Sequence, residues 1–328
     1  MLERGITMLR KLNYLFLFML MLTLSMLMFG CSSTEDDSNQ KKEVSESTST
    51  AFPVEVRDGS GESIKIEEKP DTIVSLLPSN TETAYALGLG EKIIGVSDYC
   101  NFPTEAADKP KVGGLEINIE KVLELNPDLL LLSASHFNNA KDTIKQFQTA
   151  GIDVIIVPDA NSFDGAYGTI ELIAKATGTS DKADEIISDM KKEVAEIKEK
   201  ASAIKDKKKV WIEVSSSPDL YTAANGTYID EMLDIIQAEN IAADQEGWVT
   251  MNEEQVIDRN PDVILTTYGY YIENPEEKVY GRKAWSEVPA VQNKQVYDVD
   301  NDTVSRPGPR LTEGLQLIAE KIYPEIFK

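Results

Sequence analysis

The stretch that decides the fold is DKADEIISDMKKEVAEIKEKASAI, residues 181–204, which predicts one long helix. Apolar residues recur in it every three or four positions, at Ala183, Ile186, Ile187, Met190, Val194, Ile197, Ala201 and Ile204. That spacing places them on one stripe of a helix, and the opposite face is charged. At 1.5 Å per residue such a helix is roughly 36 Å long, comparable to the diameter of a small domain. We therefore expect a rod that joins two lobes.

Two copies of one sequence pattern lie on either side of this helix. Residues 118–131 read NIEKVLELNPDLLL, and residues 252–265 read NEEQVIDRNPDVIL. Each copy predicts a short amphipathic helix that stops at Asn-Pro-Asp and leads into a buried parallel strand. Chance similarity is the alternative interpretation. Two related lobes explain better why the long helix lies between the copies.

Composition narrows the classes of function. The chain has 328 residues, enough for two domains with separate cores. Its formal net charge of -23 argues against a basic patch for nucleic acid or for anionic lipid headgroups. With one His and two Cys, a site built from several His or Cys ligands is not expected. We expect neither a metal site nor a nucleic-acid partner.

The first 30 residues predict a targeting segment. Arg10 and Lys11 precede an apolar run over residues 12–29, which ends at Gly30 and Cys31. This pattern resembles a bacterial lipoprotein signal, in which Cys31 is lipidated and becomes the first mature residue. The apolar run is also long enough for an uncleaved membrane anchor, so cleavage before Cys31 stays open. In both cases the rest of the chain lies outside the membrane.

The chain beyond Cys31 predicts a tether followed by an α/β body. Residues 31–52 hold almost nothing to bury, so we expect a disordered tether there. Apolar runs and helical periodicity then alternate on both sides of the long helix, which predicts mostly parallel, doubly wound sheets. We expect two Rossmann-like lobes over residues 53–160 and 208–328, connecting helices over residues 161–207, and a ligand cleft between the lobes.

Aromatic residues gather in the loops that follow the predicted strands. Ligands of open α/β sheets bind beyond the carboxyl ends of the strands. The loops at these ends carry Tyr99, Phe102, His136, Phe137, Tyr221, Trp248, Tyr268, Tyr270 and Tyr271. Two facing sets of this kind suit a large flat ligand with π-faces and a polar rim. Ordinary packing is the alternative for each ring taken alone.

Signals for catalysis are weak. The sequence has no phosphate-binding glycine loop, GxSxG elbow or HExxH motif. The lone His136 has no identifiable nucleophile to activate. We therefore expect a binding protein without catalytic residues. Two alternatives come from other classes: an extracellular two-lobed enzyme that depends on His136, and an adhesion lipoprotein with no small ligand.

From about Pro53 to its end, the chain resembles a class III substrate-binding protein of ABC importers, the group that delivers cobalamin, haem or ferric siderophores. The motifs that carry this resemblance are IVSL at 73–76, PSNTE at 78–82, Gly88, Gly95-Val96, the two Asn-Pro-Asp turns and the long helix. Within the group, the chain is most similar to cobalamin-binding members. The resemblance implies a rigid connecting helix, a monomer without a cofactor of its own, and delivery of the ligand to an ABC permease dimer with its ATPase.

The resemblance also implies residues that bind the ligand. Tyr99 lies in a segment similar to the corrin-stacking tyrosine region, and Tyr221 matches a position for a stacking aromatic. Trp248 matches a ligand tryptophan. Asp302 corresponds to an acid that bonds the side groups of cobalamin. Arg306 and Arg310 are expected near the cleft, where they would contact an anionic rim, as in siderophore or haem binders; the alternative for Arg310 is a structural contact that holds the final helix.

Two further tryptophan positions of the cobalamin-binding members are occupied here by Gly114 and Ser133. Phe137, or the tyrosine loop that begins at Tyr268, would then supply the missing part of the stacking surface. The candidate ligand-binding residues are therefore Tyr99, Phe137, Tyr221, Trp248, Tyr268, Asp302 and Arg306. We expect cobalamin as the ligand, with a ferric siderophore or haem as the alternative.

Equivalent positions of the two repeat copies hold Glu120 and Glu254. Related lobes would place one on the outer surface of each lobe. The resemblance implies that such a pair of acids docks on arginines of the permease dimer. The alternative for either Glu alone is an ordinary solvated helix residue. We expect the pair to form the docking site of a protein anchored to the bacterial membrane through Cys31.

Overall fold

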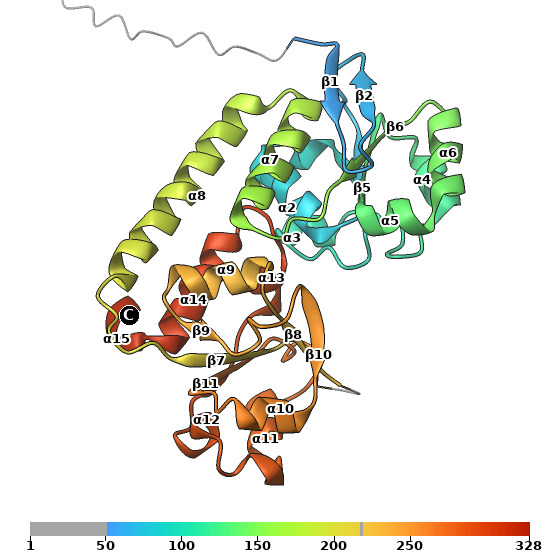
Figure 1. Ribbon diagram of the computed structural model, residues 1–328. Coiled ribbons are helices and arrows are strands. Elements are labelled where there is room, and N and C mark those ends of the chain that lie inside the picture. Colours follow the sequence, from blue (N-terminus) through green and yellow to red (C-terminus); the bar gives the residue numbers. More distant parts are fainter. Residues whose placement is uncertain (1–50, 217–218) are drawn as a thin grey trace, which may run out of the picture. The chain divides into compact units, whose positions relative to one another are not determined.

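The computed structural model describes residues 51–216 and 219–328, and Figure 1 shows its helices and strands. The predicted signal segment 1–30, the lipidation candidate Cys31 and nearly all of the predicted tether lie outside the described residues. Within the described residues, no helix combines the length and the apolar character needed to span a membrane.

The first lobe is built on four parallel strands in the order β4-β3-β5-β6. Alternate residues of β5 face two separate apolar clusters, since Leu129 and Leu131 belong to one and Leu130 and Leu132 to the other. Both faces of this sheet are therefore covered, which explains the unbroken apolar run in the sequence. The strands are β3 (Ile73–Ser75), β4 (Ile93–Val96), β5 (Leu129–Ser133) and β6 (Asp153–Val157). The helices are α2 (Pro78–Ala86), η1 (Gly90–Lys92), α3 (Thr104–Ala107), α4 (Ile119–Leu125), α5 (Ala134–Asn139) and α6 (Lys141–Thr149).

A β-hairpin precedes this sheet, as its alternating sequence predicts. Strands β1 (Val54–Arg57) and β2 (Ser63–Ile66) pair antiparallel. The Asp58 carboxylate in the turn accepts hydrogen bonds from the backbone N–H groups of Ser60 and of Ile156 in β6, each at 2.9 Å. The turn is thereby fixed to the edge strand of the first sheet.

Helices α7 (Phe163–Thr177) and α8 (Ser180–Ala201) follow the first sheet. Gly178 ends α7 in a left-handed conformation, with φ of 67°, which glycine adopts at little cost. Helix α8 is continuous over 22 residues, roughly 33 Å long, and ends three residues before the predicted Ile204. Its predicted apolar stripe is buried at Ala183, Ile187, Met190, Ile197 and Ala201. It packs against α7 of the first half and against α9, α14 and α15 of the second (Figure 1).

The second lobe repeats the topology of the first. Its parallel strands lie in the order β9-β7-β11-β12, which matches β4-β3-β5-β6 strand by strand. The structure thus confirms an α/β fold with two parallel sheets. The strands are β7 (Lys209–Glu213), β9 (Glu239–Asn240), β11 (Val263–Thr266) and β12 (Val296–Asp298). The helices are α9 (Tyr228–Ile235), α10 (Glu253–Asp258), α11 (Pro275–Tyr280), η2 (Lys283–Trp285), α12 (Pro289–Gln292), α13 (Asn301–Ser305), α14 (Leu311–Ile322) and α15 (Pro324–Phe327).

The repeated residues of the two copies begin equivalent helices. Asn118 caps α4 by accepting the backbone N–H of Lys121, and Asn252 caps α10 by accepting that of Gln255. The shared valine of each copy, Val122 in α4 and Val256 in α10, is fully buried. The repeat therefore encodes how each helix starts and which side it packs.

The Asn-Pro-Asp turns also have equivalent roles. Asn126 and Asn260 adopt left-handed conformations, with φ of 46° and 50°. The carboxylate of Asp128 accepts the backbone N–H groups of Asp71 and Thr72 beside β3. Asp262 accepts the backbone N–H of Lys209, at the start of β7, at 2.9 Å. Each Asp therefore fixes the strand that follows it to the neighbouring central strand.

A two-stranded antiparallel ribbon is present where the sequence predicts loops. It consists of β8 (Leu220–Ala223) and β10 (Trp248–Met251). Tyr221 lies opposite Thr250, and Trp248 lies opposite Ala223. The prediction of free loops at Tyr221 and Trp248 was wrong, because the partners of this ribbon are far apart in sequence and neither shows clear alternation. Both residues are held by backbone pairing.

Candidate functional site

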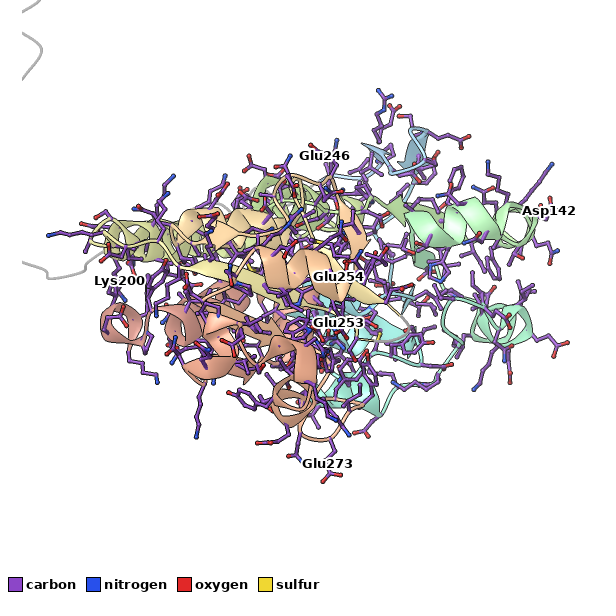
Figure 2. The ribbon with its side chains drawn as sticks, turned by 60° about the horizontal axis from the view of Figure 1, so that its bottom comes forward. Asp142, Lys200, Glu246, Glu253, Glu254 and Glu273 are labelled. Carbon is purple, nitrogen blue, oxygen red and sulfur yellow. The ribbon has the colours of Figure 1, made fainter. Side chains whose placement is uncertain are left out.

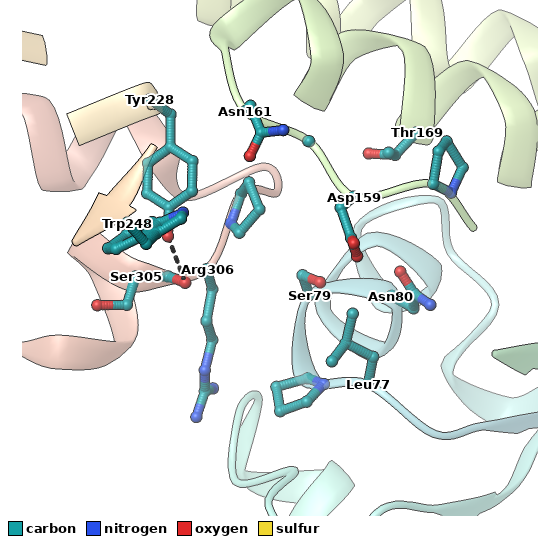
Figure 3. A pocket seen from close by; sticks show the side chains of 14 residues that line it. Leu77, Ser79, Asn80, Asp159, Asn161, Thr169, Tyr228, Trp248, Ser305 and Arg306 are labelled. Atoms are coloured by element: carbon teal, nitrogen blue, oxygen red, sulfur yellow. Dashed lines mark hydrogen bonds between the residues drawn. The ribbon is translucent and has the colours of Figure 1, made fainter. Parts of the chain in front are cut away.

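An interlobe cavity of about 440 Å³ lies between residues of the two lobes (Figure 3). The first lobe contributes the segment after β3 and the segment after β6, which are carboxyl ends of strands, as expected for this fold. Thr169 of α7 joins them. The lining residues are Leu77, Pro78, Ser79, Asn80, Pro158, Asp159, Ala160, Asn161, Thr169, Tyr228, Trp248, Ser305, Arg306 and Pro307.

Aromatic rings form the wall of the cavity that belongs to the second lobe. Trp248 stacks on Tyr221, with ring centroids 6.2 Å apart and an interplanar angle of 21°. Tyr228 meets Trp248 edge-on at 5.6 Å, and its hydroxyl donates to the backbone carbonyl of Ser305 at 3.0 Å (Figure 3). Burial raises the pKa of Tyr228, so this hydroxyl stays a neutral donor. The wall is therefore a supported aromatic surface.

Tyr228 was missed by sequence reasoning, although it completes this wall. It is the first residue of α9, directly after Thr227, whose hydroxyl caps the helix by accepting the backbone N–H of Asp230. A helix start that follows a strand-and-turn segment is a position that faces ligand in this fold. That placement was the signal available in the sequence.

The wall that belongs to the first lobe is polar and mostly uncharged. Figure 3 shows Ser79, Asn80 and Asp159 grouped across the cavity from Trp248 and Tyr228. Ser79 and Asn80 lie in the first turn of α2, and Asn161 precedes α7. Hydroxyl and amide groups offer both donors and acceptors to a ligand. Among the described lining residues, Asp159 and Arg306 are the charged ones.

Arg306 lines the cavity, and its guanidinium is already neutralised within the protein. Its Nη1 lies 2.7 Å from Oε1 of Glu82 and 2.8 Å from Oδ1 of Asn101, both in the first lobe. Its Nη2 lies 2.7 Å from Oδ1 of Asp302. Asn101 also donates to Asp302 at 2.7 Å. These bonds join the two lobes, and they occupy the predicted ligand residues Arg306 and Asp302.

Arg310 strengthens the same contact between lobes. Its guanidinium carbon lies 3.9 Å from the centroid of the Phe102 ring, a cation–π geometry. Its Nη1 is 3.6 Å from Oε1 of Glu82, and its Nε is 3.3 Å from Oε2 of Glu313. Two arginines of the second lobe thus converge on one carboxylate of the first.

Of the predicted ligand residues, Trp248 and Arg306 line this cavity, whereas five lie outside its lining: Tyr99, Phe137, Tyr221, Tyr268 and Asp302. Tyr99 is 62% exposed, and its ring lies against Gly114, where an added Cβ would be 2.6 Å from the ring. Phe137 is half-buried against the apolar cluster beneath α5, and Nζ of Lys141 lies 4.9 Å from its ring centroid. Tyr99 therefore remains available to a ligand that extends beyond the cavity, whereas Phe137 is largely engaged in packing.

Tyr268 is a core residue, which corrects its prediction as a ligand residue. It is fully buried, and its hydroxyl donates to Oε1 of Glu213 at 2.6 Å. Glu213 is itself fully buried at the end of β7, so it needs such donors. Tyr270 and Tyr271, in the same loop, are 74% and 54% exposed. The first tyrosine of the loop, Tyr268, points into the core because its hydroxyl bonds the buried carboxylate of Glu213.

His136 has a structural role in this fold. The side chain is 3% exposed. Its Nδ1 lies 2.8 Å from the hydroxyl of Ser133, and its Nε2 lies 2.9 Å from the backbone carbonyl of Gly114. Both ring nitrogens are therefore engaged at the start of α5. Within the described residues, no group of three or more His, Cys, Asp or Glu side chains is placed to hold a metal ion.

The two predicted docking acids are exposed near the starts of equivalent helices. Glu120 lies in the first turn of α4, and Glu254 lies in the first turn of α10. Figure 2, in which the bottom of Figure 1 comes forward, labels Glu254 beside Glu253. Glu253 accepts a hydrogen bond from Nε1 of Trp285 at 3.2 Å. Within the part of the chain that the structure describes, neither Glu120 nor Glu254 forms an ion pair.

Comparisons with known proteins agree with this architecture. Residues 73–303 match the periplasmic binding protein family. An uncharacterized ABC transporter substrate-binding lipoprotein of Bacillus subtilis (strain 168) is 45% identical over 293 residues, which cover 89% of this chain and 92% of the relative.

Solved structures extend the comparison to proteins with named ligands. A possible iron-binding solute-binding protein of Staphylococcus epidermidis matches with a TM-score of 0.71 and 36% identity, covering 78% of this chain and 100% of that one. The periplasmic vitamin B12-binding protein of Vibrio cholerae matches with a TM-score of 0.65 and 26% identity, covering 77% and 96%. The chain therefore belongs to the periplasmic binding protein family, and within it to the class III substrate-binding proteins that its motifs resemble.

Proposed function

We propose that this protein is the solute-binding lipoprotein of an ABC importer, anchored through Cys31, and that it binds a corrinoid such as cobalamin. Its family and its lipoprotein relative support the importer role. The vitamin B12-binding structure of the same fold supports the ligand class. The interlobe cavity supports a ligand with one flat face and a polar edge.

The observation that carries the choice of ligand is the balance of charge at the cavity. Haem carries carboxylate groups, and ferric siderophores are commonly anionic, so both require cations that are free to pair with them. Arg306, the cation among the described lining residues, is already bonded to Glu82 and Asp302. A cavity without spare positive charge favours a ligand whose edge is neutral.

The edge of a corrinoid carries neutral amides, which match the polar wall. Ser79, Asn80 and Asn161 present hydroxyl and amide groups to the cavity. Across from them, Trp248, which is supported by stacking on Tyr221, supplies a flat aromatic surface for the ring. The two walls therefore fit the two kinds of surface that a corrinoid offers.

The test is equilibrium dialysis of the purified protein against cyanocobalamin, with parallel dialyses against haemin and a ferric siderophore. We expect retention of cyanocobalamin. Trp248→Ala should weaken it by about 5- to 150-fold, since stacking of a ring on an aromatic side chain contributes about 1–3 kcal/mol. Trp285→Phe is the matched control, because Trp285 is fully buried in the second lobe and does not line the cavity.

Retention of haemin or of a siderophore without retention of cyanocobalamin would replace this proposal by the alternative ligand class. The Staphylococcus epidermidis structure, titled as a possible iron-binding protein, favours that alternative. The absorption spectrum of the retained ligand identifies it directly, because corrinoids, haem and ferric siderophores absorb at different wavelengths.

Glu120 and Glu254 are the proposed docking residues for the permease dimer. They occupy equivalent positions on two lobes of the same topology, and both are exposed. Of the two acids in the first turn of α10, Glu253 is bonded to Trp285, and Glu254 is the one proposed to pair with an arginine. We propose that the protein acts as a monomer, since one chain supplies both docking acids.

A further inference from the structure

We propose that Glu82 determines ligand specificity: its buried carboxylate holds Arg306 and Arg310, and thereby excludes ligands that carry negative charge at this edge. This inference rests on the proposed function only in taking the interlobe cavity as the ligand site. The class of ligand that it excludes is a flat ring with carboxylate groups, and the class that it admits is a ring with neutral amides.

Glu82 lies in α2 and reaches from the first lobe to the second. Its side chain is 2% exposed, and Oε1 lies 2.7 Å from Nη1 of Arg306. The same oxygen is 3.6 Å from Nη1 of Arg310. Ser79 and Asn80 line the cavity from the start of this helix, so the carboxylate is one helical turn behind the polar wall.

A purely structural role does not explain the second carboxylate oxygen of Glu82. Oε2 is buried and has no hydrogen-bond partner among residues 51–216 and 219–328. Burial raises the pKa of Glu82, although the hydrogen bond and charge of Arg306 act to lower it. A buried polar atom without a partner costs free energy and calls for an explanation. Control of the charge on Arg306 supplies that explanation.

The surroundings show what would remain if Glu82 were neutral. Arg306 would keep Asp302 at 2.7 Å and Asn101 at 2.8 Å. Arg310 would keep Glu313 at 3.3 Å and its position over Phe102. The two guanidinium groups would then face two carboxylates instead of three, and Asn101 and Phe102 would still join the first lobe to the second. Arg306 would then pair with Asp302 as its one carboxylate, so a ligand carboxylate at the cavity would meet less opposing negative charge.

An arginine at the cavity is unexpected in a protein that binds neutral ligands, and pairing with Glu82 explains its presence. An arginine in a cavity normally attracts carboxylate or phosphate groups, which it binds in a bidentate manner. Here a resident carboxylate satisfies it first. Specificity then arises from repulsion of the wrong ligand as much as from contacts with the right one.

The test compares pairs of ligands that share a ring and differ in charge. One pair is cyanocobalamin and its derivative in which one peripheral amide is hydrolysed to a carboxylate. The other pair is haemin and its dimethyl ester. Affinities are measured by dialysis for the wild-type protein, for Glu82→Gln, and for the double variant Glu82→Gln, Arg306→Gln.

We expect the wild-type protein to prefer the neutral member of whichever pair binds. Glu82→Gln should shift the ratio of affinities toward the acidic member by about tenfold, equivalent to about 1.4 kcal/mol. Affinity for the neutral member should change by less than about threefold. The double variant should restore the original preference, because the freed cation is gone. Arg306→Gln alone should strengthen the preference for the neutral member.

An unchanged ratio in Glu82→Gln, or equal loss of both members of a pair, overturns the role of Glu82. Thermal unfolding of each variant shows whether a loss of both comes from loss of the fold, and Arg306→Gln then still tests the direction of the ratio. A shifted ratio for the haemin pair, with no binding of cyanocobalamin, supports Glu82 and refutes the corrinoid proposal. Binding of cyanocobalamin with an unshifted ratio supports the corrinoid proposal and refutes the role of Glu82. Binding of neither ring contradicts both.

Discussion

Arg282→Met should destabilise the second lobe severely. Glu213, fully buried, accepts hydrogen bonds from Nη1 and Nη2 of Arg282 at 2.8 and 2.5 Å. Burial acts to lower the pKa of Arg282, but the hydrogen bonds to Glu213 and the charge of that carboxylate together raise it, so Arg282 stays charged. Removing one partner of a buried ion pair leaves a charge without compensation and costs about 3–5 kcal/mol.

Two other hydrogen-bond donors to Glu213 limit this loss of stability. Nε1 of Trp211 lies 3.0 Å from Oε2 of Glu213, and the hydroxyl of Tyr268 lies 2.6 Å from Oε1. They remain when Arg282 is replaced, so each oxygen keeps one bond and the loss should fall near the lower end, at about 3 kcal/mol. Met also keeps part of the packing of Arg282 over Trp285, whose ring centroid is 4.6 Å from the guanidinium.

Urea unfolding of the purified protein measures the loss, and fluorescence of the buried Trp211 and Trp285 reports on this lobe. A double variant, Arg282→Met with Glu213→Gln, is the sharper comparison. It removes the Glu213 charge that the single variant leaves buried without its arginine. We expect it to recover at least about 1 kcal/mol. A single variant that loses less than about 1 kcal/mol, or a double variant less stable than the single, would refute the reasoning.

Two further predictions concern the repeated segments. Burial acts to raise the pKa of Asp128, but hydrogen bonds from Thr72 and Asp71 outweigh it and hold that pKa below its ordinary value. The stability that Asp128 contributes is therefore present above its unfolded pKa, and it is lost as the pH falls through the lower folded pKa. Asp128→Asn should cost about 0.5–1 kcal/mol at pH 7 because the group is solvent-screened, and the difference from wild type should shrink at pH 3 in urea unfolding. A difference that stays constant with pH would contradict the role of the charge. Glu120→Arg with Glu254→Arg should abolish cellular uptake of labelled cyanocobalamin while dialysis shows unchanged affinity. Glu124→Arg with Glu273→Arg, two other exposed acids of the two lobes, is the control pair, and an equal loss of uptake there would remove the docking assignment.

The sheets were predictable from the sequence because parallel strands buried on both faces appear as unbroken apolar runs. Strands β4 (Ile93–Val96) and β6 (Asp153–Val157) lie in such runs. The ribbon of β8 and β10 was not predictable, since its pairing joins Tyr221 to Thr250 across an intervening helix. Local pattern carries no information about such a partner.

The candidate site was predictable in part. Resemblance placed Trp248 and Arg306 at the ligand site, and both line the interlobe cavity. Tyr268 was assigned to the ligand surface because its neighbours are aromatic, but its position depends on Glu213, a polar residue inside an apolar strand. The pairing of Glu82 with Arg306 joins residues from opposite ends of the chain, and only the folded arrangement brings them together.

The equivalent Asn-Pro-Asp turns give this chain an internal reference. One turn holds Asp128 with bonds from the side chain and backbone of Thr72 and from the backbone of Asp71, whereas the other holds Asp262 with a bond from the backbone of Lys209. The same substitution made at either position can thus be compared in one molecule, under one set of solvent conditions. Whatever separates the two results measures what the additional bonds to Asp128 contribute to stability.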